Sequence, residues 1–310
     1  MQLQRGFEDP SAFRGGFVSI GNFDGVHRGH QQIVSVLVGH ARKAGVPSVV
    51  LTFDPHPIAL LRPGQVPHSL STVEHKAELL GRLGVDCVIA YPTDELLLAL
   101  SPDEFFDQIV RGKLAARGLV EGPNFFFGHD RSGDIATLER LCEQAGLMLE
   151  VVHPIQIGDR VISSSAVRAR VAEGNIAAAI DLLGHPYQIS GRVARGAARG
   201  RQLGFPTANL VDVVTQLPPD GVYAGAVRRG ERVYPAAVHL GPNATFGEAA
   251  RKLEVHILDF DGDLYDELLC VDLYDRIRGT IRFSDANELK SQMTRDVERV
   301  REIVGRAKNE

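Results

Sequence analysis

Apolar residues in the first half of the chain follow the pattern of strands that alternate with helices. Short continuous apolar runs are typical of strands buried on both faces of a parallel sheet, and stretches with apolar residues at helical spacing separate them. The runs lie at 17–20, 47–53, 84–90 and 148–153, and the helical stretches lie at 31–38, 71–83, from 101 onwards, 135–145 and around 167–176. This alternation from Phe17 to Leu183 predicts a doubly wound α/β domain.

The second half of the chain changes to short β-runs separated by turns. These runs lie at 187–193, 221–228, 232–240, 252–260 and 266–274. Their spacing predicts a small antiparallel β-barrel, and helical spacing of apolar residues in 284–306 predicts a terminal helix. Gly184 and Pro186 are stop signals for the last helix of the first half. We therefore predict two domains, 1–184 and 185–310.

The composition is that of an ordinary soluble protein, with 44% apolar and 24% charged residues. A formal net charge of −5 argues against non-specific nucleic-acid binding. The N-terminus lacks the apolar core of a signal peptide, and no stretch approaches the ~18 apolar residues of a membrane helix. The 3 cysteines are odd in number and far apart, so we expect no disulfide framework. These features favour a cytoplasmic protein. We further expect a protein that acts on small molecules, as a monomer or weak homo-oligomer.

The segment 21–30, GNFDGVHRGH, lies between a predicted strand and a predicted helix. Free backbone N–H groups and the helix dipole make such a turn a ready anion site, and glycines allow close backbone approach. His27 and His30 share one face of the first helical turn. This pattern fits the phosphates of a nucleotide. Surface or core histidines, or a metal pair, are the alternatives, although no Cys pair or H-E-x-x-H offers the further ligands of zinc.

Two other segments of the first half carry candidate ligand-binding residues. Asp54 and His56 follow a predicted strand, where they either belong to a rigid loop or line the crevice at the carboxyl ends of the strands. In an extended segment, Phe125 and Phe127 point one way and Phe126 the other. A core position is the ordinary interpretation for these rings, and an apolar wall for a heteroaromatic ring is the alternative.

The serines at 163–165 precede a helical run, and capping of that helix is their ordinary role. The same hydroxyl and N–H groups, together with Arg168 one turn into the helix, are also able to bind phosphate. The chain contains no Walker A sequence.

The predicted barrel contains a possible metal site and a possible base. In 204–209, GFPTAN, Pro206 pre-sets the backbone, and Thr207 and Asn209 point to one side of an extended segment. Two neutral oxygens on one side suit Mg²⁺, which also binds water and phosphate. Glu254 lies on the polar face of a predicted strand, where a solvent-facing position is the ordinary interpretation.

These segments together resemble the bacterial bifunctional riboflavin kinase/FAD synthetase family. The segment 21–30 resembles the H-x-G-H signature of Rossmann-like nucleotidyltransferases, and in full it is similar to the adenylyltransferase module of that family. Residues 122–128 resemble its G-x-N-F-x-F-G block, and 162–168 resemble its I-S-S-T-x-x-R block. The run 200–210 is similar to the riboflavin kinase signature G-R-x-L-G-F-P-T-A-N-L, and 220–223 and 241–246 continue the match.

The resemblance implies an enzyme that phosphorylates riboflavin with ATP to FMN, and then transfers AMP from ATP to FMN to give FAD. It implies catalytic roles for His27 and His30 in the first domain and for Glu254 as the kinase base, and metal ligation by Thr207 and Asn209. It implies that ATP is bound by Gly21, Asn22, Phe23, Asp24, His27, Gly29, His30, Ser164, Ser165, Arg168, Gly204, Pro206 and Thr207. It implies that Asn124 contacts substrate, and we assign flavin binding to Asn124, Phe125, Phe127, Asp54 and His56.

The chain departs from the family pattern at a few positions. Pro123, Ala197 and Thr280 stand where acidic residues are frequent, and Ala244 stands where a proline is usual. Because Thr207, Asn209 and Glu254 are retained, we expect an active kinase. The rival hypotheses are a monofunctional adenylyltransferase with a decayed barrel, a flavin-binding regulator or carrier without turnover, and a cytidylyl- or pantetheine-type transferase that shares H-x-G-H.

Overall fold

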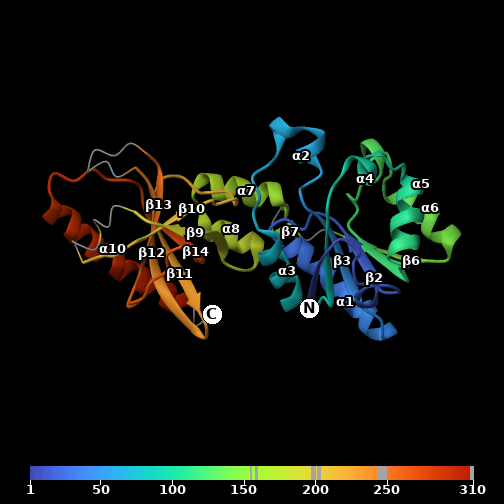
Figure 1. Ribbon diagram of the computed structural model, residues 1–310, viewed down its shortest axis with the longest axis horizontal. Coiled ribbons are helices and arrows are strands. Elements are labelled where there is room, and N and C mark those ends of the chain that lie inside the picture. Colours follow the sequence, from blue (N-terminus) through green and yellow to red (C-terminus); the bar gives the residue numbers. More distant parts are fainter. Residues whose placement is uncertain (154–155, 158–159, 197–199, 201–203, 243–249, 308–310) are drawn as a thin grey trace. The chain divides into compact units, whose positions relative to one another are not determined.

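The computed structural model of the chain describes residues 1–153, 156–157, 160–196, 200, 204–242 and 250–307. The chain forms two compact units, and Figure 1 labels most of their helices and strands. The first unit comprises Met1–Pro67 and Thr72–Ser163, and the second comprises His68–Ser71 and Ser164–Glu310.

The first unit is built on a six-stranded parallel sheet with the order β1-β4-β3-β2-β5-β6. Its strands are β1 (Gln2–Arg5), β2 (Phe17–Ile20), β3 (Ser48–Phe53), β4 (Cys87–Tyr91), β5 (Gly118–Glu121) and β6 (Met148–Val151). The predicted strands at 17–20, 47–53, 84–90 and 148–153 are present as β2, β3, β4 and β6, whereas β5 and β1 were not predicted. β1 was not predicted because its sequence, QLQR, has a single apolar residue; it forms an edge of the sheet by pairing with β4. A small hairpin, β7 (Gln156–Ile157) with β8 (Arg160–Val161), follows the sheet.

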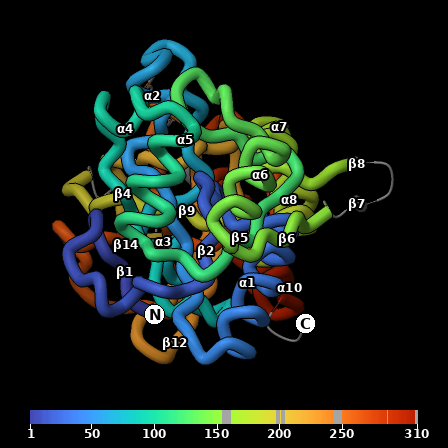
Figure 2. The backbone as a smooth tube through the Cα atoms, turned by 90° about the vertical axis from the view of Figure 1, so that its right-hand side faces the viewer, coloured from blue at the N-terminus to red at the C-terminus, as the bar shows by residue number. Residues whose placement is uncertain are grey.

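Helices cover both faces of this sheet, so the predicted doubly wound arrangement is confirmed. Alternate residues of β3 belong to different cores: Val49 and Leu51 pack in one cluster, and Val50 packs in the other. The neighbours β2 and β5 are seen side by side in Figure 2. The α-helices are α1 (Arg28–Ala44), α2 (Ile58–Leu61), α3 (Val73–Arg82), α4 (Glu95–Ala99), α5 (Pro102–Phe105) and α6 (Ile135–Ala145). The π-helix is η3 (Phe106–Lys113), and the 3-10 turns are η1 (Pro10–Ala12), η2 (Pro63–Gln65) and η4 (His129–Arg131).

Side-chain caps fix where these helices begin. Thr72 caps α3, as its sequence predicts, by accepting a hydrogen bond from the N–H of His75. Ser101 and Glu104 form a capping box at the start of α5. In α1, His27 is the N-cap and Gly45 ends the helix with a φ of +65°, so the helix is longer at its C-terminal end than the predicted segment 31–38.

The second unit contains a closed antiparallel barrel with the order β10-β13-β12-β11-β14-β9. Its strands are β9 (Tyr187–Ala194), β10 (Ala208–Val211), β11 (Gly221–Arg229), β12 (Arg232–Gly241), β13 (Lys252–Ile257) and β14 (Leu268–Arg278). The terminal helix α10 (Ala286–Ala307) packs on β11, β12 and β14, and buries Val300 and Val304 against Ala224 and Ala226. The predicted barrel and terminal helix are both confirmed.

The helices α7 (Ser164–Glu173) and α8 (Ile176–Leu183) pack with the barrel, although they precede the predicted boundary at 184/185. Val171 and Ile176 lie in one core cluster with Tyr187 of β9. The boundary between the two compact units therefore follows Ser163, because these apolar helix faces are buried against barrel residues. Gly184 ends α8 with a φ of +77°, as its sequence predicts. The boundary between functional domains, 184/185, stays a prediction.

A buried carboxyl group holds β2 and β5 together where their pairing ends. The ladder between the two strands includes Phe17 and Val18, and the side chain of Glu121 then accepts a hydrogen bond of 2.7 Å from the N–H of Ile20. Glu121 is 3% exposed. Burial raises its pKa well above the ordinary 4.5, and the hydrogen bond from Ile20 only partly opposes this.

We expect Glu121→Gln to stabilise the first unit more at high pH than at low pH. Because folding raises the pKa of Glu121, the protonated carboxyl contributes stability that is complete below the unfolded pKa and is lost as the pH rises through the folded pKa. Glutamine keeps an acceptor for Ile20 and does not ionise. Calorimetry of the full chain should give a larger gain in Tm at about pH 8 than at about pH 5. Glu143→Gln, at an exposed position of α6, is the control, and an equal gain at both pH values would contradict the assignment.

Candidate active sites

The turn from β2 into α1 is tight and strained, and it places His27 at the start of the helix. Phe23, Gly25 and Val26 all have positive φ, and a β-branched residue such as Val26 rarely adopts this conformation. The side chain of His27 caps α1, since its Nδ1 accepts a hydrogen bond of 3.3 Å from the N–H of His30. Its Nε2 therefore carries the ring proton in the neutral form. The two imidazoles stack with their centroids 3.6 Å apart.

His30 and Asn22 present polar atoms to this turn that the described residues do not satisfy. Nδ1 of His30 and Oδ1 of Asn22 are buried without a hydrogen-bond partner among the residues that the structure describes. Burial holds the pKa of His30 well below its usual range, and the positive charges of His27 and Lys76 lower it further. Unsatisfied buried polar atoms beside a helix N-terminus are suited to an anionic, hydrogen-bonding ligand.

The rest of the segment 21–30 shapes the turn. The N–H of Gly21 continues the sheet by donating to the carbonyl of Leu51 at 3.0 Å. Phe23 and Asp24 are buried, and the ring of Phe23 lies 5.0 Å from that of His30. A Cβ on Gly29 would lie 3.2 Å from the ring of His27, so glycine allows the imidazole to sit over the first helical turn.

Asp54 and His56 lie after the carboxyl end of β3, as predicted, and both make contacts within the protein. The carboxylate of Asp54 pairs with Arg5 at 3.3 Å, and Arg5 also pairs with Glu74. Nδ1 of His56 accepts a hydrogen bond of 3.1 Å from the N–H of Ile58. Their assignment to the flavin stays a prediction.

The three phenylalanines divide between two sides, as the alternation predicts, although their segment is not a strand. Phe125 and Phe127 stack at 5.4 Å, and the buried Phe127 also contacts Phe105 of the core. Phe126 is 45% exposed, with the guanidinium of Arg131 over its ring at 4.8 Å. The ordinary interpretation of a core position therefore holds for Phe127. Flavin binding by Phe125, Phe127 and the exposed Asn124 stays a prediction.

Ser164, Ser165 and Arg168 belong to the second unit, at the start of α7. Nε of Arg168 donates to the carbonyl of His68 at 2.8 Å, and the carbonyl of Arg168 accepts from the side chain of Gln216. These bonds tie α7 to other segments of its unit. The assignment of the three residues to the ATP phosphates stays a prediction.

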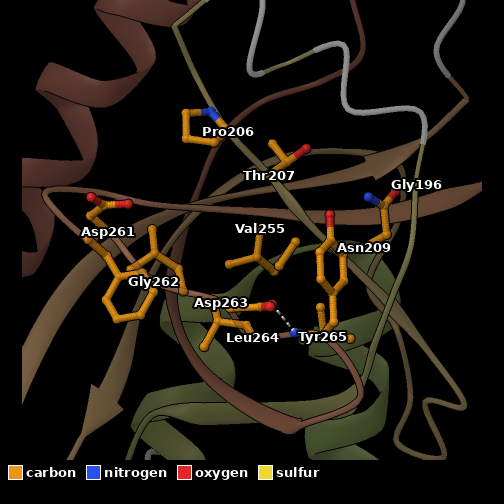
Figure 3. A pocket seen from close by; sticks show the side chains of 14 residues that line it. Gly196, Pro206, Thr207, Asn209, Val255, Asp261, Gly262, Asp263, Leu264 and Tyr265 are labelled. Carbon is orange, nitrogen blue, oxygen red and sulfur yellow. Dashed lines mark hydrogen bonds between the residues drawn. The ribbon is translucent and has the colours of Figure 1, made fainter.

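A cavity of about 470 Å³ opens in the barrel unit, and Figure 3 shows the side chains around it. It brings together Pro206, Thr207 and Asn209, which the sequence singled out, from the segment that enters β10. Gly204, at the exposed start of this segment, has a φ of +88° that favours glycine. The opposite lining was not predicted: it comes from the loop after β13 and includes Asp261, Asp263 and Tyr265.

Glu254 lies in a row of polar side chains across three strands of the barrel. It pairs in register with Asn209 of β10 on one side and with His239 of β12 on the other. Such opposite residues share one face of the sheet with their Cβ atoms about 5 Å apart. The side chain of Glu254 is 18% exposed, and its Oε2 lies 3.5 Å from Nδ1 of His239. Glu254 is therefore largely shielded from solvent, unlike an ordinary strand glutamate.

A second histidine on the same face holds the segment of the predicted metal ligands, Thr207 and Asn209, beside β13. Nδ1 of His256 hydrogen-bonds to the carbonyl of Pro206 at 2.7 Å, and the ring of Phe205 packs edge-on against it. The alternation of β13 places His256 on the face of Glu254, but its partner was not predictable without the strand register. Ala197 and the block 243–245, which includes Ala244, lie outside the described residues, whereas Thr280 is exposed after β14.

The described residues form neither a cluster of metal ligands nor a membrane-spanning helix. Among the described residues, no three His, Cys, Asp or Glu side chains gather where they could hold a metal ion. Within the same part of the chain, no helix combines the length and the apolar character that a membrane crossing requires.

Comparison with known proteins assigns a class to each part of the chain. Residues 9–166 match the family model of FAD synthetase, and residues 183–304 match that of riboflavin kinase. The first part is thus a nucleotidyltransferase domain and the second a flavokinase domain.

Named relatives match this chain over most of its length. Proteins named bifunctional riboflavin kinase/FMN adenylyltransferase from Escherichia coli strain K12 and from Pseudomonas fluorescens are each 37% identical, over 99% and 98% of both chains, respectively. That of Bacillus subtilis strain 168 is 34% identical over 90% of this chain and 89% of its own. A solved structure from Streptococcus pneumoniae, described as a macrolide-efflux protein, is 31% identical, with a TM-score of 0.83 over 97% of this chain and 98% of its own. The chain belongs to the bifunctional riboflavin kinase/FMN adenylyltransferase family.

We expect His30 to be mostly neutral at pH 6.5, the ordinary midpoint of a histidine, in the folded chain. Its folded pKa is lowered, so the neutral ring contributes stability above pH 6.5 that is lost as the pH falls through the folded pKa. An NMR titration of the full chain tests this, with the His30 signal identified by its absence in His30→Gln. A His30 ring that is half protonated or more at pH 6.5 would contradict the described environment.

Proposed function

We propose that this chain makes FAD from riboflavin in two ATP-dependent steps at two separate sites. The barrel unit phosphorylates riboflavin to FMN, and the parallel-sheet unit transfers AMP to FMN and releases pyrophosphate. The observation that supports this most strongly is that each unit holds its own cluster of polar residues within a matched family domain. A decayed barrel, the rival hypothesis, does not account for a cavity still lined by both Thr207 and Asn209.

In the adenylyl transfer, the FMN phosphate attacks the α-phosphorus of ATP and pyrophosphate leaves. The nucleophile is already an anion, so the site needs charge stabilisation and in-line positioning rather than a strong base. The N-terminus of α1 supplies dipole and N–H groups, and His27 donates from Nε2 because its Nδ1 is occupied by the N–H of His30. His30 binds phosphate with its neutral ring. We assign Ser164 and Arg168 to the ATP phosphates from their sequence motif alone.

In the kinase, Glu254 accepts the proton of the ribityl 5′-hydroxyl as this oxygen attacks the γ-phosphorus of ATP, and ADP leaves as the bond from the γ-phosphorus to the bridging oxygen breaks. A weakly nucleophilic hydroxyl benefits from a carboxylate placed to take its proton. His239, 3.5 Å from the carboxylate, keeps Glu254 oriented on the face of Asn209. Pro206, fixed by His256, aligns the segment that contacts the nucleotide.

Mg²⁺ fits the kinase cavity through Thr207 and Asn209. Both residues line the cavity and carry neutral oxygens, and Mg²⁺ prefers a small number of protein oxygens together with water and phosphate. When bound, the ion neutralises charge on the ATP phosphates.

We also propose that the protein works in the cytoplasm on small molecules, as a monomer or weak homo-oligomer, without a nucleic-acid or membrane partner. The net charge of −5 supports the absence of a nucleic-acid partner.

Single substitutions should separate the two activities. We expect His30→Ala to lower FAD formation from FMN about 100-fold or more and to leave FMN formation unchanged, because a phosphate-binding group is lost at one site alone. Glu254→Ala should lower FMN formation by a similar factor, about 100-fold, and spare FAD formation from added FMN. Both are measured by chromatography of the products. If either substitution abolishes both activities in a folded chain, two independent sites are ruled out.

A further inference from the structure

A buried lysine lies beneath the turn that carries His27 and His30. Lys76 is on α3 and is 6% exposed, next to the buried Ala77 in the sequence. Lysine is rarely buried to this degree without a specific partner. Its Nζ donates a hydrogen bond of 3.0 Å to Oγ1 of Thr52, which is itself fully buried in β3.

Thr52 connects Lys76 to the turn through a second hydrogen bond. Its hydroxyl donates to the carbonyl of Asn22 at 3.1 Å, and its lone pair accepts from Lys76. A hydroxyl has one proton, so accepting from the ammonium directs this proton to Asn22. The chain of hydrogen bonds Lys76–Thr52–Asn22 therefore links α3, across β3, to the residue that precedes the strained Phe23.

The charge of Lys76 also acts on the groups around the turn. Burial lowers the pKa of Lys76, while the carboxylates of Asp24 and Asp54 oppose this. The ammonium of Lys76 and the ring of His27 both disfavour protonation of His30. A positive charge here adds to the N-terminal dipole of α1, and both attract an anion.

We propose that Lys76 is a positioning residue of the adenylyl-transfer site. Through Thr52 it fixes the backbone of Asn22, and its buried charge favours ATP phosphates at the turn without touching them. This inference rests on the proposed function, and it adds a residue that neither the sequence motifs nor the matched signatures singled out. This role of Lys76 requires a polyanionic ligand at the turn, because a buried cation adds little to the binding of a neutral ligand.

Three variants separate the charge from the hydrogen bond. Lys76→Met removes both, Thr52→Val removes the hydrogen bonds and keeps the charge, and Lys43→Met removes an exposed lysine of α1 as the matched control. The kinase activity of the same chain reports whether the second unit is intact, and calorimetry reports whether the first unit folds.

We expect Lys76→Met to lower kcat/KM for ATP in FMN adenylylation about tenfold or more, mainly through KM, and to leave riboflavin phosphorylation unchanged. The pKa of His30, followed by NMR, should rise in Lys76→Met and stay low in Thr52→Val, although Thr52→Val should also weaken adenylylation. Lys43→Met should change neither. A purely structural role would not move the His30 titration in one variant alone.

Adenylylation within twofold of the unsubstituted chain in Lys76→Met, or an unchanged His30 titration in that variant, would overturn the proposal. If Lys76→Met does not fold, Lys76→Arg replaces it: retained charge should keep the His30 pKa low, and a raised pKa would overturn the proposal. The unsubstituted chain must first convert FMN to FAD. Failure of that reaction would reject the proposed function itself, and is thereby distinguished from failure of the lysine assignment.

Discussion

Burial of the parallel sheet on both faces is the constraint on which the first site depends. Alternate residues of β3 pack into different cores, so polar ligand-binding groups find room mainly at the carboxyl ends of the strands. There the chain turns from β2 into α1, and the N-cap His27, the unsatisfied atoms of His30 and Asn22, and the helix dipole meet. The strain at Val26 is maintained because the surrounding turn is buried and hydrogen-bonded.

In the second site, closure of the barrel determines which residues of neighbouring strands lie opposite each other. β10 is a short strand, and the barrel closes only because β10 pairs with both β9 and β13. That pairing sets Asn209 opposite Glu254, and the next pairing sets Glu254 opposite His239. The proposed metal ligand and base are far apart in sequence, and the strand register brings them to one face. The two units therefore use different geometry for two kinds of phosphate chemistry.

The periodicity of apolar residues predicted the elements that bury an apolar face. It failed where burial or strand pairing depends on residues distant in the sequence. The strands β2, β3, β4 and β6 and the helix α3 follow from their apolar patterns, whereas the polar β1 owes its position to β4. The packing of α7 and α8 with the barrel depends on partners that no local pattern reveals. Motifs singled out His27, His30, Thr207, Asn209 and Glu254, but the contacts of His239 and Lys76 depend on the fold and could not be predicted from the sequence.

One chain carries out both steps, and the time course of the flavin products tests this most directly. Purified protein is incubated with riboflavin, ATP and Mg²⁺, and the flavins are separated by chromatography. We predict that FMN forms first and that FAD follows. Absence of any product from riboflavin, together with FAD from added FMN, would contradict it, because the barrel would then lack the kinase chemistry assigned to Glu254, Thr207 and Asn209.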